Sequence, residues 1–184
     1  MTEPQAPAAS QPHEADLSRT YVLVLIVELI VMAALSEALI TANKTEEDMN
    51  RRFASQINAR IALDQLRREI HCASAVTPTG SSATITITLG SRCPTAGAGT
   101  TVSWCTSGSG TQYALYRTVG ATCNTGGRKV VDYLTASTVF SFAAQSVSSL
   151  AILSVTLPVN TNPASSLPDY RLSDDIVLRN STRS

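Results

Sequence analysis

The chain has 184 residues, of which 43% are hydrophobic, which is enough for one domain of ordinary size and one appended segment. Its 14 basic and 14 acidic residues cancel, and no basic cluster is present. Nucleic-acid-binding proteins carry a basic patch that displaces phosphate counterions, so this composition argues against a nucleic-acid partner.

The chain starts with a polar, leader-like segment, residues 1–20. Its single arginine, Arg19, stands against three acidic residues, which makes it a poor secretory signal because such signals begin with a basic region. The apolar run that follows, residues 21–42, has roughly the 20 residues that span a bilayer core. We therefore expect a transmembrane or filament-core helix here; a buried core helix is the alternative.

Few polar residues interrupt the apolar run: Glu28, Ser36, Glu37 and Thr41. Glu28 lies within "VLIVELIVMAAL", where a carboxylate is costly in lipid unless it has a partner. The sequence therefore marks Glu28 as a candidate functional residue. The alternatives are that Glu28 is protonated or lies at the lipid headgroups.

Residues 43–72 are predicted to form an amphipathic helix. Thr45 followed by Asp48 is typical of a helix cap, which predicts a short break near residues 43–46, with an uninterrupted helix as the alternative. The apolar residues recur at intervals of three and four, which predicts a single apolar face that contains Phe53, Ile57, Ile61, Leu66 and Ile70, with Ala59, Ala62 and Leu63 beside them.

Residues 73–184 are rich in Thr, Ser, Gly and Val, and they predict an antiparallel β domain. In "ATITITLG" the apolar residues Ala83, Ile85, Ile87 and Leu89 alternate with threonines, as in a half-buried strand. Further strands are expected in "TTVSW", "QYALYRTV", "TVFSF", "LAILSVTLPV" and "YRLSDDIVL". The predicted fold class is α+β, with the amphipathic helix packed on an antiparallel sheet.

Four cysteines lie in the second half of the chain: Cys72, Cys93, Cys105 and Cys123. An even number in a Thr/Ser-rich β domain favours two disulfides and an oxidising location outside the cytoplasm, while a zinc site lacks a Cys-x-x-Cys motif. A three-stranded meander would favour pairing Cys93 with Cys123 and Cys72 with Cys105. The alternative is Cys72 with Cys93 and Cys105 with Cys123.

With these features the chain resembles the type IV pilin family. The stretch "VLIVEL" matches the start of the mature family sequence, with Val24 first and Glu28 fifth. The stretch "ARIALDQLRREI" is similar to larger minor pilins and to J-type pseudopilins of type II secretion, and "YRLSDDIVLRN" is similar to their closing strand. The resemblance implies a pilin-like fold and a structural subunit of a pilus or secretion filament.

The resemblance also implies partners and a location. The chain would lie in the cytoplasmic membrane before assembly, in contact with lipid, where a prepilin peptidase is a further partner that the family implies. The chain would then join other pilin or pseudopilin subunits in a filament at the cell surface. Glu28 would contact the amine freed at Val24 of a neighbouring subunit.

One position departs from the family. Prepilin processing requires Gly, or less often Ala, before the first mature residue, and here that residue is Leu23. The alternative function is therefore an uncleaved single-pass membrane protein whose β domain binds a ligand at the cell surface. The basic residues after the apolar run, Lys44, Arg51 and Arg52, would place the β domain in the cytoplasm, whereas the cysteines and the family place it outside.

Catalysis has little support in the sequence. His71 and Cys72 could form a base and a nucleophile, but adjacent helical residues point about 100 degrees apart. Asp169, Asp174 and Asp175 could bind calcium, although adjacent aspartates on a strand face opposite sides, which favours a solvated edge. No cofactor, phosphate-loop or metal motif is present, so we expect a protein that is not an enzyme and has no metal site.

Overall fold

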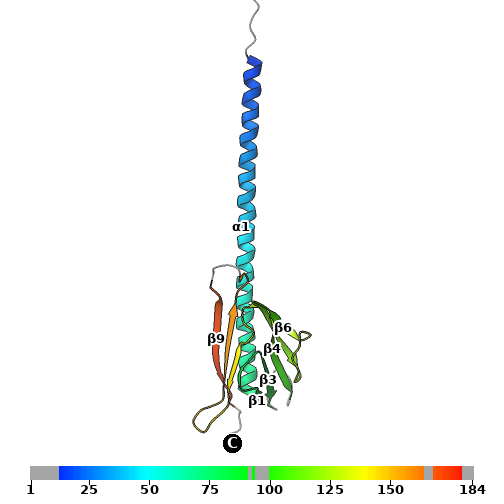
Figure 1. The fold of residues 1–184 in the computed structure, drawn as a ribbon, viewed down its shortest axis with the longest axis vertical. Coiled ribbons are helices and arrows are strands. Elements are labelled where there is room, and N and C mark those ends of the chain that lie inside the picture. Colours follow the sequence, from blue (N-terminus) through cyan, green and yellow to red (C-terminus); the bar gives the residue numbers. More distant parts are fainter. Residues whose placement is uncertain (1–12, 91–92, 94–99, 164–167, 180–184) are drawn as a thin grey trace, which may run out of the picture. The chain divides into compact units, whose positions relative to one another are not determined.

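A computed structural model describes residues 13–90, 93, 100–163 and 168–179, with side chains from residue 19 onward. The chain divides into two compact units, Met1–Glu47 and Asp48–Ser184. One helix, α1 (His13–Cys72), contributes residues to both units, and every strand belongs to the second unit (Figure 1).

Helix α1 continues through residues 43–46, so the predicted break is wrong and the uninterrupted alternative is correct. Thr45 does not cap a helix. Its hydroxyl donates a hydrogen bond of 2.9 Å to the Thr41 carbonyl one turn earlier, and the Thr41 hydroxyl does the same to Glu37 at 2.9 Å. Because these hydroxyls find acceptors inside the helix, the polar stretch does not end it.

The second unit contains a nine-stranded sheet in which all pairs are antiparallel. Its first five strands are β1 (Ala73–Thr77), β2 (Gly80–Ser82), β3 (Thr84–Leu89), β4 (Thr101–Ser109) and β5 (Gln112–Val119). The others are β6 (Arg128–Leu134), β7 (Phe140–Ala143), β8 (Ile152–Val159) and β9 (Tyr170–Val177). The α+β, pilin-like fold class is confirmed.

The strand order is β1-β3-β4-β5-β6-β8-β7-β2, with β9 paired to β8 outside this path. Strands β1 and β2 stand at opposite ends of the order, yet only Pro78 and Thr79 separate them in the chain. The sheet therefore curls until its ends approach each other, and the second part of α1 packs on it (Figure 1).

Strand β3 shows the predicted alternation, because Ile85, Ile87 and Leu89 are buried whereas the threonines between them are not. Strands β4, β5, β7, β8 and β9 lie in the other predicted stretches. Strands β1, β2 and β6 were not predicted. β2 has only three residues, and β6 begins with two charged residues, so neither carries an alternating pattern.

The core of the second unit forms between the sheet and one face of α1. The helix residues on this face are Ser55, Ala59, Ala62, Leu63, Leu66, Glu69 and Ile70, all buried. The prediction of a single apolar face is wrong for Phe53, Ile57 and Ile61, which are 66%, 40% and 58% exposed. Residues 57 and 59 stand about 200 degrees apart around a helix, so this second apolar stripe lies outside the core.

The same isoleucine-to-alanine substitution on each of the two helix faces distinguishes the buried face from the exposed one. We expect Ile70→Ala to lower the free energy of unfolding by about 2 to 5 kcal/mol, because Ile70 is fully buried and its loss leaves a cavity. Ile61→Ala should change it by less than about 0.5 kcal/mol. The measurement is denaturant unfolding of the full chain in detergent, followed by the fluorescence of Trp104, the one tryptophan. Equal losses would contradict the assignment of faces.

Candidate functional site

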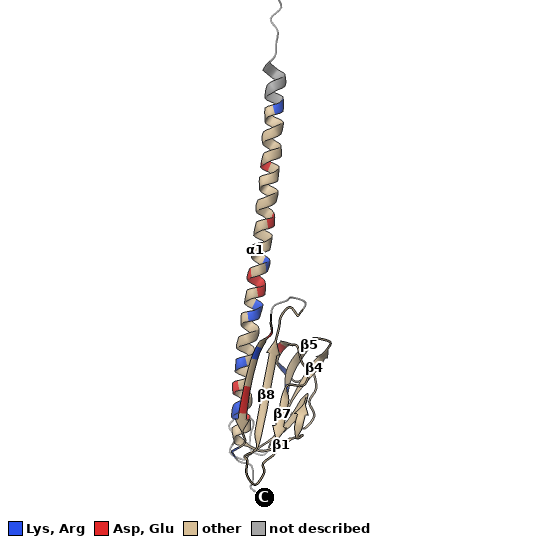
Figure 2. Cartoon of the chain, turned by 60° about the vertical axis from the view of Figure 1, so that its left-hand side comes forward, with Lys and Arg blue, Asp and Glu red and all other residues tan. Residues whose placement is uncertain are grey.

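The apolar segment of the first unit presents its side chains to the surroundings on every side. Fourteen large apolar residues between Tyr21 and Ile40 are 47% to 70% exposed. Figure 2 shows how few charged residues interrupt this part of α1. Such a continuous apolar surface is not stable in water, and its length matches a bilayer core, so the segment has the properties of a membrane anchor.

Glu28 is isolated within this segment. The nearest charged residues along the chain are Arg19 and Glu37, each nine positions away, or about 14 Å of helical rise. The residues one turn before and after Glu28 are Val24, Leu25, Val31 and Met32. No opposite charge of this helix segment can therefore reach the Glu28 carboxylate.

Val24 lies one turn before Glu28, so the two residues share a face of α1, and Val24 is 49% exposed. The structure thus places both predicted assembly residues on one accessible surface. Leu23, at the position where the pilin family has Gly, is helical and 63% exposed.

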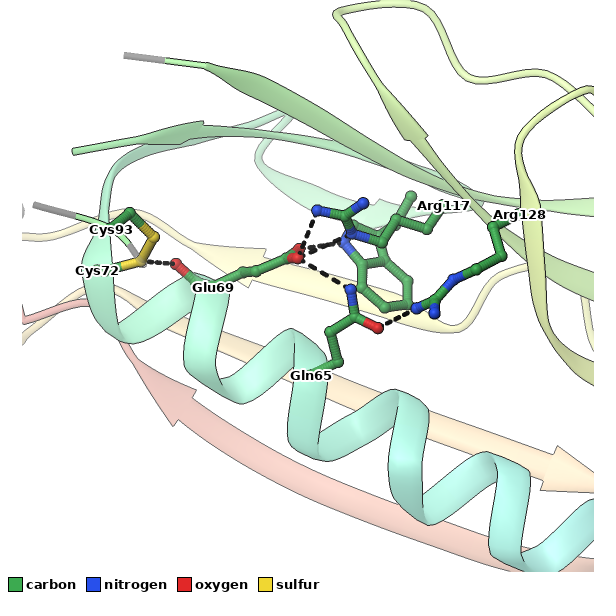
Figure 3. A network of polar contacts seen from close by, with 7 residues as sticks. Gln65, Glu69, Cys72, Cys93, Arg117 and Arg128 are labelled. Atoms are coloured by element: carbon green, nitrogen blue, oxygen red, sulfur yellow. Dashed lines mark hydrogen bonds and ion pairs between the residues drawn. A yellow bond between two sulfur atoms is a disulfide. The ribbon is translucent and has the colours of Figure 1, made fainter. Parts of the chain in front are cut away.

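A second carboxylate, Glu69, is fully buried in the other unit (Figure 3). The Trp104 indole nitrogen donates a hydrogen bond of 2.8 Å to Glu69 Oε2. Arg117 Nε and Nη2 each lie 2.8 Å from Glu69 Oε1, which also accepts a 3.2 Å hydrogen bond from Gln65. Both oxygens are occupied, so this carboxylate holds α1 on the sheet and is not poised for chemistry.

No pattern in the sequence predicted this network. A glutamate in an amphipathic helix is ordinarily assigned to solvent, and Arg117 lies in a strand otherwise rich in apolar residues. Trp104 and Arg117 are directly opposite each other on β4 and β5, so the sheet presents both donors at one place. The available signal was the position of Glu69, between Leu66 and Ile70 on the face that packs inward.

The cysteines form two pairs, but not the pairs that were favoured. Cys72 lies with Cys93 and Cys105 with Cys123, with Cα atoms 5.4 Å and 5.9 Å apart, within the range of disulfides. The favoured pairing of Cys93 with Cys123 and of Cys72 with Cys105 is wrong, and the alternative is correct.

Two features of the chain path explain this pairing. The unpredicted strand β1 pairs Ala73 with Leu89, and Gly90 N donates to the Cys72 carbonyl at 3.1 Å, so the end of α1 lies where β3 ends, near Cys93. The chain after β5 turns back along that strand, so that Cys123 Sγ lies 3.9 Å from the Tyr116 carbonyl oxygen. Tyr116 is the residue opposite Cys105.

Strand β9 is fastened to α1 by side chains. Arg67 binds Asp174 through Nη2 at 2.7 Å, which raises the pKa of Arg67 chiefly through this hydrogen bond. Arg60 Nε donates to the Tyr170 hydroxyl at 3.2 Å. His71 Nδ1 lies 3.2 Å from the Val177 carbonyl oxygen, while its neighbour Cys72 belongs to a cysteine pair.

The three aspartates considered for calcium do not converge. Asp174 contacts Arg67, Asp175 is exposed on the strand, and Asp169 accepts hydrogen bonds from Thr135 Oγ1 at 2.6 Å and Asn160 Nδ2 at 3.0 Å. Within the described residues, no group of three His, Cys, Asp or Glu side chains is placed to hold a metal ion.

Comparison with known proteins adds no relative: no family model, curated protein or solved structure matches the chain. Functional inference therefore depends on the fold and on the residues described above.

The Glu69 network predicts a stability effect. Glu69→Gln should lower the free energy of unfolding by about 3 to 5 kcal/mol, because it leaves the guanidinium of Arg117 without its buried counter-charge. Glu46→Gln, an exposed substitution of the same kind in the same helix, should leave it unchanged. Unfolding followed by Trp104 fluorescence makes the comparison. A loss below 1 kcal/mol for Glu69→Gln would show that the ion pair adds little.

The hydrogen bonds to Asp169 predict an acid dependence. The bonds from Thr135 and Asn160 lower the pKa of Asp169 below its ordinary value of 3.8. Its stabilising contribution is therefore fully present above about pH 4 and is lost as the pH falls through the lowered pKa. Asp169→Ala should destabilise the domain at pH 7, and the difference from wild type should narrow below pH 4. Asp175→Ala, at an exposed position, should show no such narrowing.

Proposed function

We propose that the chain is a structural subunit of a pilin-type filament, a minor pilin or pseudopilin that assembles through the apolar part of α1. The pilin-like α+β fold supports this proposal. The observation that carries it is Glu28, one carboxylate in an exposed apolar helix with no other charged residue closer than nine positions. Packing of such helices in a filament core buries Glu28 and creates the need for a positive partner.

In this proposal, the partner is the amine of Val24 on a neighbouring subunit, freed by a prepilin peptidase. Two groups that are each costly in an apolar core would offset one another. The exposed surface shared by Val24 and Glu28 on α1 supports contacts of this kind between neighbouring helices. The pair would serve assembly, and the chain would have no catalytic role.

The proposed location is the cytoplasmic membrane before assembly and a cell-surface filament afterwards, with the β domain outside the cytoplasm. The apolar helix supports the membrane stage. The two cysteine pairs support an oxidising compartment, since disulfides are rare in the reducing cytoplasm.

A second candidate function is an uncleaved single-pass membrane protein whose β domain binds a ligand at the surface. Leu23 favours it, because a bulky residue stands where the peptidase of the pilin family requires a small one. In this case Glu28 has no amine partner, and the helix serves only as an anchor.

Substitution of Glu28 separates the two functions. We expect Glu28→Ala to leave the β domain folded and to reduce filament incorporation at least tenfold, because a broken buried ion pair costs about 3 to 5 kcal/mol. Glu37→Ala removes the same group nine positions later, at the edge of the apolar run, and should incorporate normally. The measurement is an immunoblot of sheared surface material from a host that lacks the native chain.

Equal incorporation of wild type and Glu28→Ala would refute the pairing role. Absence of both from sheared material, with both retained in membranes, would favour the single-pass protein. Sequencing the N-terminus of the native protein distinguishes the two functions independently. Cleavage after Leu23, at the position where pilins are processed, leaves Val24 as the first residue.

A further inference from the structure

Strand β6 has one unpaired edge. Its first edge pairs with β5 from Arg128 to Leu134, but on its second edge the described residues supply only one strand partner, Val159 opposite Leu134. Tyr133 has a φ of 61°, unusual for a residue with a side chain, and its carbonyl accepts a 2.9 Å hydrogen bond from Asn160 N. This kink separates the rest of β6 from β8, so in the described part of the chain no strand pairs with the six residues 128–133 on that side.

The unpaired edge faces a groove beside α1. One hollow of about 220 Å³ is lined by the five consecutive residues 129–133 of β6 and by Arg51, Ala54, Ser55 and Asn58 of α1. Successive side chains of a strand point to opposite faces, so five consecutive residues can line one hollow only if the backbone edge faces it.

A second hollow of about 190 Å³ continues the first toward Gln65 and Arg128, and Asn58, Lys129 and Val130 line both. We call the two together the α1–β6 groove. From Arg51 to Gln65 it follows about 21 Å of helix, at 1.5 Å per residue. Six residues of extended chain measure about 20 Å, so the groove has the length of one strand.

The groove carries more basic than acidic residues. Arg128 and Lys129 of β6 line it with one acidic residue, Asp132, and Arg51, which also lines it, has an interaction of its own. Asp132 already binds Lys129, and the Arg128 guanidinium donates to the neutral amide oxygen of Gln65 (Figure 3). Val130 and the exposed Ile61 add apolar contacts. A segment that fits this groove is extended, carries acidic residues and has small or apolar residues between them.

We propose that the α1–β6 groove binds an extended acidic segment of a partner protein, which adds to the sheet as a strand beside β6. The backbone groups of residues 128–132 on this edge would bond the segment, and alternate side chains of the segment would contact the basic residues. Strand β9 differs from β6, because side chains of α1 already contact it at Asp174 and at the Val177 carbonyl. An unpaired strand edge can pair unspecifically with other chains. A partner strand beside β6 would cover this edge.

The test uses the full chain in detergent micelles and a labelled, capped peptide of eight alternating threonine and glutamate residues. Three matched peptides test whether binding requires acidic charge and backbone hydrogen bonds. They are the acidic peptide, a threonine–lysine peptide, and the acidic peptide with two central threonines replaced by proline. Fluorescence anisotropy should show binding of the acidic peptide and at least tenfold weaker binding of the other two. Amide hydrogen exchange should slow at residues 128–133 when the acidic peptide is bound.

Substitutions in the groove complete the test. Arg128→Glu combined with Lys129→Glu should weaken binding of the acidic peptide at least tenfold, whereas Arg171→Glu, on the exposed face of β9, should leave it unchanged. Circular dichroism confirms that each variant is folded. Equal binding of the proline peptide, protection elsewhere than β6, or no binding of the acidic peptide would overturn the proposal. The exchange measurement on wild type decides the matter even if the double variant does not fold.

Discussion

The buried carboxylate of Glu69 determines how the second part of α1 lies on the sheet. Trp104 and Arg117 are opposite each other on two adjacent strands, and both bind this one side chain from α1. Apolar contacts alone would tolerate a shift of the helix by one turn, because they are not directional. The carboxylate does not tolerate it, since displacement would leave a buried guanidinium and a buried carboxylate without partners. Glu69 therefore fixes the register of the helix together with the Cys72–Cys93 pair and strand β1, which follows α1 directly.

This register explains which apolar residues of α1 remain outside. With Glu69 directed at β4 and β5, the small residues Ala59 and Ala62 face the sheet and allow close approach. The larger Phe53, Ile57 and Ile61 then remain outside the core. The second part of α1 thus has one face that belongs to the domain core and another that remains available. The first part, residues 21–42, is apolar all round, which suits lipid or a bundle of helices and not a domain surface.

The fold class could be predicted from the sequence because it depends on the periodicity of apolar residues, which is visible in short stretches of the chain. Alternation identified β3, and the three-and-four spacing identified the helix up to Cys72. The features that were predicted wrongly or not at all depend on contacts between residues that are distant in the sequence. The cysteine pairing required β1, whose five mostly small residues give no signal until β3 is placed beside them. The Glu69 network required Trp104 and Arg117 to be cross-strand neighbours, which no local pattern reveals. Glu28, in contrast, was evident from the sequence because its isolation is a property of the chain itself.

The free-energy cost of placing the Glu28 carboxylate in apolar surroundings indicates the stage at which it needs a counter-charge. Twelve Leu, Ile and Val residues between Val22 and Ile40 favour insertion into a bilayer by roughly 4 to 7 kcal/mol together, at about 0.3 to 0.6 kcal/mol each. One carboxylate opposes insertion by about 3 kcal/mol, in part because the bilayer admits water around it. A single helix can therefore remain in the membrane without a partner for Glu28. In a packed bundle of helices, water is excluded and the cost rises. In the proposed function, the need for a counter-charge would therefore arise when helices pack together and not when a single helix is anchored.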